Sequence, residues 1–161
     1  MGTFVVAGVT QIETIVKVDE IPINYQPLTS KVDSIYTAVG GDAYNESLAL
    51  KWLGDEVYFM SIVGRNQDLS IINPTDRKIT ISTEYIIPQM KETPTEVVLY
   101  DSNRKQQIFE DIKDLRDNVY DMSMFAPIAE QSDMVVLANA NFCRPFAQAA
   151  KNHNKKIAVN I

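Results

Sequence analysis

Short runs of consecutive apolar residues, each followed by glycine or a turn, constrain this chain more than any other feature of its sequence. Phe4–Ala7 is the first such run, and Gly8 follows it. Val57–Val63 and Met134–Leu137 are predicted to be further strands. Near-continuous apolar strands are typical of parallel sheets, because helices cover both faces of such a sheet. The sequence therefore predicts a mostly parallel sheet in which the first run is a central strand.

Helical segments separate these strands. Helices are predicted over 42–53, 112–120 and 144–152. In the first helix, Leu48 and Trp52 lie four residues apart on one face, and Gly54 follows as a C-terminal cap residue. A further strand is predicted over 157–161. The order of strands and helices predicts an α/β fold whose mostly parallel sheet is flanked by helices.

Three segments fall outside this layer and predict a second, smaller sheet. They cover about 12–18, 34–39 and 95–109, and they are rich in β-branched and aromatic residues. The last segment is predicted to form a hairpin, because Asp101–Asn103 has the chemistry of a tight turn. We expect this small sheet to project from the main sheet and to cover a site.

Composition and charge exclude several classes of protein. The chain has 161 residues, of which 45% are hydrophobic, so it can bury a core without a disulfide or a structural metal. It carries 15 Lys and Arg against 21 Asp and Glu, a net charge of -6. This balance argues against a nucleic-acid-binding protein, which needs a basic face. No apolar run approaches the roughly 20 residues that span a membrane, so we expect no membrane partner.

Cys143 and His153 are the only cysteine and the only histidine of the chain. A zinc site built from Cys and His is therefore excluded, and we predict no metal site in this chain. One thiol cannot form an internal disulfide, which fits a reducing compartment, so we expect a cytoplasmic location. Cys143 itself is expected to be a buried thiol rather than a nucleophile.

The segment that carries chemistry is Gly40–Gly41, at the junction of a predicted strand and a predicted helix. Two glycines let a ligand approach the backbone closely, and the start of a helix offers free N–H groups. Asn45, one turn into the helix, can donate and accept hydrogen bonds, which suits a polyhydroxyl ligand. The same residues also fit a tight turn with a solvated Asn45, so this pattern alone leaves both interpretations open.

These residues resemble the first signature of the PfkB, or ribokinase-like, carbohydrate kinases. The resembling segments are Gly40–Gly54 with its diglycine and Asn45, Val5–Gly8 with Glu13, Val57–Gly64, Ile81–Ile86 and Thr93–Arg104. The resemblance implies a ribokinase-like sheet flanked by helices, with the small projecting sheet as a lid. It also implies a phosphotransferase that uses ATP and Mg to phosphorylate a hydroxymethyl oxygen of a sugar or nucleoside.

The resemblance assigns roles to individual positions. The residues that would bind substrate hydroxyls are Glu13, Gly40, Gly41 and Asn45. The residues that would belong to the lid are Thr95 and Val97. The small sheet often serves as a dimer interface in this family, so we expect a homodimer with candidate contacts at Tyr36, Tyr100 and Ile108.

Several positions depart from the family's pattern. Glu13 stands where Asp is usual, so its extra methylene either intrudes into the sugar pocket or re-aims the carboxylate. Asn66 and Asn160 stand where the family usually has Asp. The second signature, which resembles Asp-Thr-x-Gly-Ala-Gly-Asp and supplies the anion hole and catalytic base, is absent, so no catalytic residue is assigned. We therefore expect 1–161 to be the N-terminal portion of the kinase domain, without the C-terminal ATP-binding half and inactive alone.

Two other functions fit the sequence less well than a fragment of a sugar kinase. The substitutions at Glu13, Asn66 and Asn160 also fit a non-catalytic sugar- or nucleoside-binding relative that acts as a sensor. An unrelated α/β nucleotide-binding or structural domain is the third alternative, although neither a Walker loop nor a Gly-x-Gly-x-x-Gly motif is present. For an incomplete sheet that ends on an apolar strand, we expect poor solubility or self-association.

Overall fold

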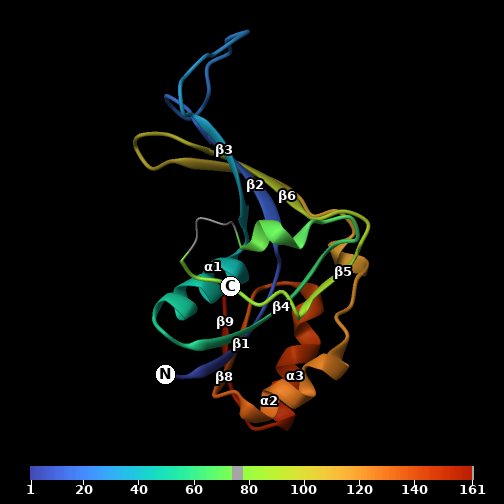
Figure 1. Ribbon diagram of the computed structural model, residues 1–161. Helices are drawn as coiled ribbons and strands as arrows, with labels where there is room; N and C mark the ends of the chain where they lie inside the picture. Colours follow the sequence, from blue (N-terminus) through green and yellow to red (C-terminus); the bar gives the residue numbers. More distant parts are fainter. Residues whose placement is uncertain (74–77, 161) are drawn as a thin grey trace.

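Figure 1 shows the computed structural model of the chain, which describes residues 1–73 and 78–160. Its main sheet has five parallel strands in the order β5–β4–β1–β8–β9. They are β1 (Thr3–Ala7), β4 (Glu56–Gly64), β5 (Ile86–Met90), β8 (Met134–Leu137) and β9 (Lys156–Val159). The central position predicted for the first apolar run is confirmed. The strand predicted over 157–161 is confirmed for residues 157–159, and Ile161 lies outside the described residues.

Helices cover both faces of the main sheet, as its apolar strands require. The helices are α1 (Asp42–Trp52), α2 (Ala126–Gln131) and α3 (Arg144–Asn152). Val5 and Ala7 of β1 point into a core that includes side chains of α2 and α3, while Val6 points into a core that includes side chains of α1. The side chains of these three residues of β1 are fully buried. Burial of each valine contributes about 1.5–3 kcal/mol, so β1 is a main source of stability.

Helix α1 buries a different face from the one predicted. Ala43, Tyr44 and Ser47 are its buried residues, and the Tyr44 hydroxyl donates a 2.8 Å hydrogen bond to the carbonyl of Ile72. Leu48 packs at the edge of this core, but Trp52 is 72% exposed, so the predicted pairing of Leu48 and Trp52 on the packed face was wrong. A step of four residues turns a helix about 40° beyond one full turn. That rotation carries position 52 further from the packed face than position 48.

The helix predicted over 112–120 is also wrong, because this segment contains only one short 3₁₀ turn. Lys113 has a φ of 53°, in the left-handed region that interrupts a helix. The side chains of Asp111 and Asp114 accept hydrogen bonds from the backbone N–H groups of Lys113 and Lys91. Aspartate side chains thus satisfy backbone groups here in place of helical hydrogen bonds.

The smaller sheet has four strands in the order β3–β2–β6–β7, and it projects from the main sheet (Figure 1). Its strands are β2 (Gln11–Lys17), β3 (Ile35–Gly40), β6 (Thr95–Tyr100) and β7 (Gln106–Asp111). The strands β2 and β6 pair in parallel, and the two outer pairs are antiparallel. The predicted small sheet and its hairpin between β6 and β7 are confirmed.

Short 3₁₀ turns occur in the connections between these elements. They are η1 (Leu69–Ile72), η2 (Leu115–Asp117), η3 (Met122–Met124) and η4 (Asn141–Cys143). Across residues 1–73 and 78–160, no helix has the length and apolar character needed to cross a lipid bilayer.

The packed face of α1 can be tested with two aromatic substitutions on the same helix. Tyr44→Ala removes a fully buried ring and should lower the free energy of unfolding by about 3–5 kcal/mol. Trp52→Ala removes a larger ring that is mostly exposed and should change it by less than about 0.5 kcal/mol. Urea denaturation followed by circular dichroism measures both. A larger loss for Trp52→Ala would contradict the described packing of α1.

Candidate functional site

The diglycine turn joins the end of β3 to the start of α1 in a crowded place. Gly40 is the last residue of β3, and Gly41 is the N-cap residue of α1 with a φ of 103°. A side chain on Gly41 would overlap the carbonyl of Val9, and a side chain on Gly40 would overlap the carboxylate of Glu13. Gly41 therefore needs glycine both for close backbone approach and for its conformation, whereas at Gly40 a side chain would have to displace the Glu13 carboxylate.

Glu13, on β2, is directed at this turn. Its Oε1 accepts a 2.9 Å hydrogen bond from the N–H of Gly41 and a 3.2 Å hydrogen bond from Nε2 of Gln11. Its longer side chain is accommodated against Gly40, where any side chain would collide with it. Glu13 is not among the residues that line the cavity beside the turn, but its two hydrogen-bond donors, Gly41 and Gln11, are.

A cavity of about 180 Å³ lies beside the turn, between the base of the small sheet and the end of β8. The polar residues that line it are Gln11, Asp42, Glu96, Glu110 and Asn139. A second cavity of about 410 Å³ shares Glu110 and Asn139 with it and includes Arg116. The two spaces are therefore neighbours, and both present donors and acceptors suited to a ligand with many hydroxyl groups.

Three carboxylates lie side by side at the base of the small sheet. In the strand register, Glu96 on β6 is opposite Glu13 on β2 and opposite Glu110 on β7. Gln11 donates a 2.6 Å hydrogen bond from its Nε2 to Oε2 of Glu96. Burial raises the pKa of the Glu96 carboxyl, the charges of Glu13, Glu110 and Asp42 raise it further, and the hydrogen bond from Gln11 opposes them.

The structure separates the predicted substrate residues from the predicted lid residues. Glu13, Gly40 and Gly41 meet at the turn, and Asn45 lies exposed in the first turn of α1, with its backbone N–H on the carbonyl of Gly41. Thr95 and Val97 lie in β6, paired with Ile12 and Thr14. Side chains alternate along a strand, so Thr95 and Val97 point to the face opposite Glu13 and Glu96.

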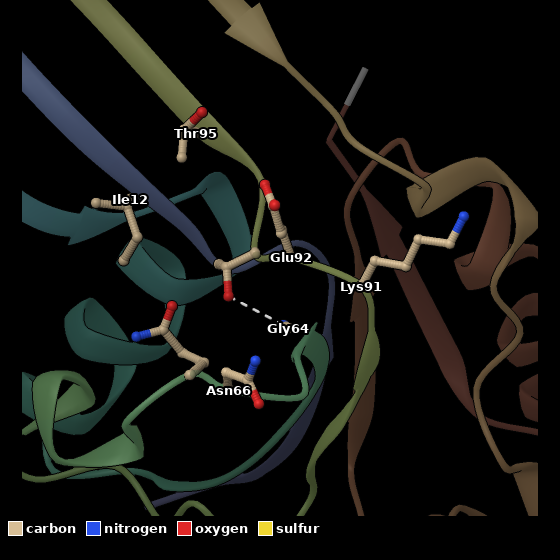
Figure 2. A pocket seen from close by; sticks show the side chains of 8 residues that line it. Ile12, Gly64, Asn66, Lys91, Glu92 and Thr95 are labelled. Carbon is tan, nitrogen blue, oxygen red and sulfur yellow. Dashed lines mark hydrogen bonds between the residues drawn. The ribbon is translucent and has the colours of Figure 1, made fainter.

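Thr95 instead borders a third cavity, of about 260 Å³, on that opposite face (Figure 2). Ile12, Asn66 and Thr95 surround this space in the close view. The N–H of Gly64 donates a 2.9 Å hydrogen bond to Oγ1 of Thr93 beneath it. The base of the small sheet thus has a hollow on each face, and only one of them contains the diglycine turn.

Sequence reasoning missed Gln11, Glu96 and Glu110 as site residues. A signal for Glu96 was present, because it lies between the two lid residues Thr95 and Val97 and must therefore point to the other face of its strand. The register that places it opposite Glu13 joins strands that are about eighty residues apart. A single sequence does not disclose such a register.

Two other residues singled out in the sequence have structural partners. The side-chain amide of Asn160 donates a 2.9 Å hydrogen bond to Asp42 and thereby joins the end of β9 to the start of α1. Cys143 is buried, its thiol lies 3.4 Å from the carbonyl of Ala7, and burial raises its pKa to about 12. The expectation of a buried thiol is confirmed, and such a thiol does not supply a thiolate nucleophile at neutral pH.

The sequence matches one protein family, and the fold matches solved structures that are about twice as long. Residues 1–160 match the family described as pfkB family carbohydrate kinase. No curated protein matches the chain.

Three of the similar solved structures are Sa239, the microbiome-derived acarbose kinase Mak1, and the ribokinase of Arabidopsis thaliana complexed with ribose and ATP. Their TM-scores are 0.84, 0.81 and 0.75, at 16%, 19% and 16% sequence identity. The matches cover 100%, 98% and 99% of this chain but only 55%, 52% and 53% of those chains. The chain therefore spans about half their length, and at these identities the likeness concerns the fold alone.

The crowding at the diglycine turn can be tested by comparing alanine substitutions at Gly41 and at Gly54, which has a similar backbone conformation but no close neighbours. Gly41 and Gly54 both have a positive φ, of 103° and 91°, but a side chain on Gly54 would meet no atom within 4 Å. Gly54→Ala should cost about 1–2 kcal/mol of stability, from its conformation alone. Gly41→Ala should cost a further ~1–3 kcal/mol, because its side chain would collide with the backbone at Val9. Equal losses in urea denaturation would contradict the described crowding.

Proposed function

Because this chain belongs to the pfkB family of carbohydrate kinases, we propose that it forms the sugar-binding part of an enzyme that transfers the γ-phosphoryl group of ATP to a hydroxymethyl oxygen of a sugar or nucleoside. Its fold is ribokinase-like, with a parallel sheet flanked by helices and a small second sheet. The observation that carries the proposal is the diglycine turn, held between Val9 and Glu13 beside a polar cavity at the base of the small sheet.

The proposed sugar site consists of this turn, with Glu13 and Asn45, and the face of the small sheet above it. Carboxylate and amide groups can bind sugar hydroxyls, which both donate and accept hydrogen bonds. Phosphoryl transfer needs the acceptor oxygen to be aligned and water to be excluded. We propose that the small sheet supplies this exclusion as a lid over the sugar.

ATP and magnesium are proposed for the whole protein rather than for this chain alone. The cavity beside the turn is lined by three carboxylates and by no Lys or Arg, so its lining does not suit a triphosphate. Among residues 1–73 and 78–160, no group of three or more His, Cys, Asp and Glu is placed to hold a metal ion. The ribokinase of Arabidopsis thaliana, of which this chain covers 53%, is complexed with ATP. This supports an ATP site formed by residues outside the present sequence.

A non-catalytic sugar sensor is the second candidate function, and one observation favours it. The resemblance assigns Glu13 to substrate hydroxyls, but one of its carboxylate oxygens, Oε1, already accepts hydrogen bonds from Gly41 and Gln11. A relative that had lost catalysis could tolerate such a change. The proposed location, for either function, is the cytoplasm, which is consistent with the one buried thiol.

The proposed activity is tested with the full-length protein of which this chain is a part. Sugar-dependent formation of ADP across a panel of pentoses, hexoses and nucleosides is the expected result. Asn45→Ala should raise the KM for the sugar about threefold to tenfold, the effect of losing one or two neutral hydrogen bonds. Asn152→Ala, an exposed asparagine at the end of α3 on the other side of the main sheet, is the matched control. Sugar binding by calorimetry without any ADP formation would instead support the sensor.

We also propose that the small sheet joins two copies of the chain. Ile35, Val97 and Phe109 are exposed on the face that points away from Glu13. The candidate contacts Tyr36 and Ile108 are exposed as well, but on the face of Glu13, which is the face proposed to cover the sugar. The outward face is therefore the better dimer surface.

Light scattering of the chain tests this dimer. The wild-type chain should have about twice the mass of one copy, and Phe109→Asp should shift it toward the monomer. Ile108→Asp places the same charge on the residue next to Phe109 in β7, whose side chain points to the face of Glu13. This control substitution should leave the dimer intact. A monomeric wild type, or dissociation by Ile108→Asp alone, would contradict the outward-face dimer.

A further inference from the structure

Of the two glutamates that face each other on β2 and β6, only Glu96 of β6 lines the cavity beside the diglycine turn. Glu96 of β6 lines this cavity, together with Asp42 and Glu110. Glu13 of β2 is not among its lining residues, and its Oε1 accepts hydrogen bonds from two residues that are, Gly41 and Gln11. The position at which a sugar hydroxyl could meet a glutamate is therefore displaced by one strand.

Gln11 fixes this arrangement. It is 8% exposed, and its Nε2 donates to Oε1 of Glu13 and to Oε2 of Glu96. One amide thus holds both glutamates at neighbouring register positions. Each carboxylate has a second oxygen, and that of Glu96 belongs to a side chain that borders the cavity. Gln11 would act through Glu96, as a positioning residue.

The charge around this cavity limits what it can bind. Asp42, Glu96 and Glu110 contribute three carboxylates, and none of the residues that line it is Lys or Arg. Arg116 lies in the neighbouring larger cavity. A carboxylate or phosphate on the ligand would be repelled by this lining, whereas hydroxyl and ammonium groups would donate to it.

Given the proposed function, on which this inference rests, we propose that Glu96 is the substrate-binding carboxylate of this chain, positioned by Gln11, in the role that the family resemblance assigns to Glu13. The ligand it selects is a polyhydroxyl compound that is uncharged or carries an amino group. Sugar acids, whose carboxylate would face this lining, are excluded from the site.

The energetics of Glu96 agree with a role in binding rather than in stability. Burial and the neighbouring carboxylates raise its pKa, so its charged form is less favourable in the folded chain than in the unfolded chain. The folded state therefore gains stability as the pH falls through the raised pKa, and it is destabilised by the charge above that pKa. Replacing the carboxylate with the isosteric amide should leave the melting temperature at neutral pH unchanged or raise it.

Calorimetry of the chain with D-ribose, D-fructose, D-glucosamine and D-gluconate tests the proposal. At least one of the first three should bind, and D-gluconate should not. Glu96→Gln should weaken binding at least tenfold without lowering the melting temperature. Asp111→Asn removes a charge from the opposite face of β7 and should change the affinity less than twofold.

The positioning role is tested with a double-mutant cycle. Gln11→Ala should weaken binding in the wild type but have no further effect in the Glu96→Gln background, because it acts through Glu96. Equal effects of Gln11→Ala in both backgrounds would overturn this role.

Other outcomes separate this proposal from the proposed function. If Glu13→Gln abolishes sugar binding while Glu96→Gln changes it less than twofold, the assignment of Glu96 is overturned and the sugar site stands. Binding of gluconate as tightly as the uncharged sugars overturns the ligand class. If no sugar binds and the whole protein forms no ADP with the panel, the proposed function fails, and this assignment fails with it.

Discussion

Close approach of backbone segments at the junction of the two sheets is the constraint on which the site and the lid both depend. A side chain on Gly8 would collide with Ala43 and Ala138, and one on Gly41 would collide with the carbonyl of Val9. A side chain on Gly64 would lie 2.5 Å from the backbone nitrogen of Thr93. Three of the chain's six glycines therefore lie at the junction of the two sheets, where backbone segments pass close to one another. A larger side chain at any of these glycines would push the small sheet away from the diglycine turn.

Under the proposed assignment, the glutamates at this junction exchange a role that the family resemblance gives to Glu13. The Gly41 N–H needs an acceptor near the start of α1, and Glu13 is long enough to supply one. Of the two facing glutamates, the one that borders the cavity is Glu96, on the neighbouring strand. The same backbone fold can therefore present a substrate with an acidic group from β6, which lies in the hairpin of the lid. Recognition of the substrate would then be linked to the position of the lid.

Local patterns in the sequence predicted the strands well, because apolar runs and alternating segments are properties of neighbouring residues. The central place of Phe4–Ala7 and the hairpin around Asp101–Asn103 followed from such patterns. The helix over 112–120 failed because Asp111 and Asp114 hold backbone N–H groups that a helix would have used differently. The diglycine turn was identified, but Glu96 was missed, because its place opposite Glu13 depends on a register between distant strands.

The small sheet enters and leaves the main body of the molecule through short connections, at residues 8–10, 41, 91–94 and 112–114. Its four strands are hydrogen-bonded to one another along their lengths. A hinge motion at these connections would therefore rotate the small sheet as one rigid body. Glu96 is the second residue of β6, and Glu110 is the fifth of the six residues of β7. Both residues therefore lie close to the hinge connections. A swing that carries the far loop between β2 and β3 through a wide arc would displace these carboxylates only slightly. Rotation of the small sheet would therefore open a broad path for a ligand while the carboxylates of Glu96 and Glu110 stay nearly in place.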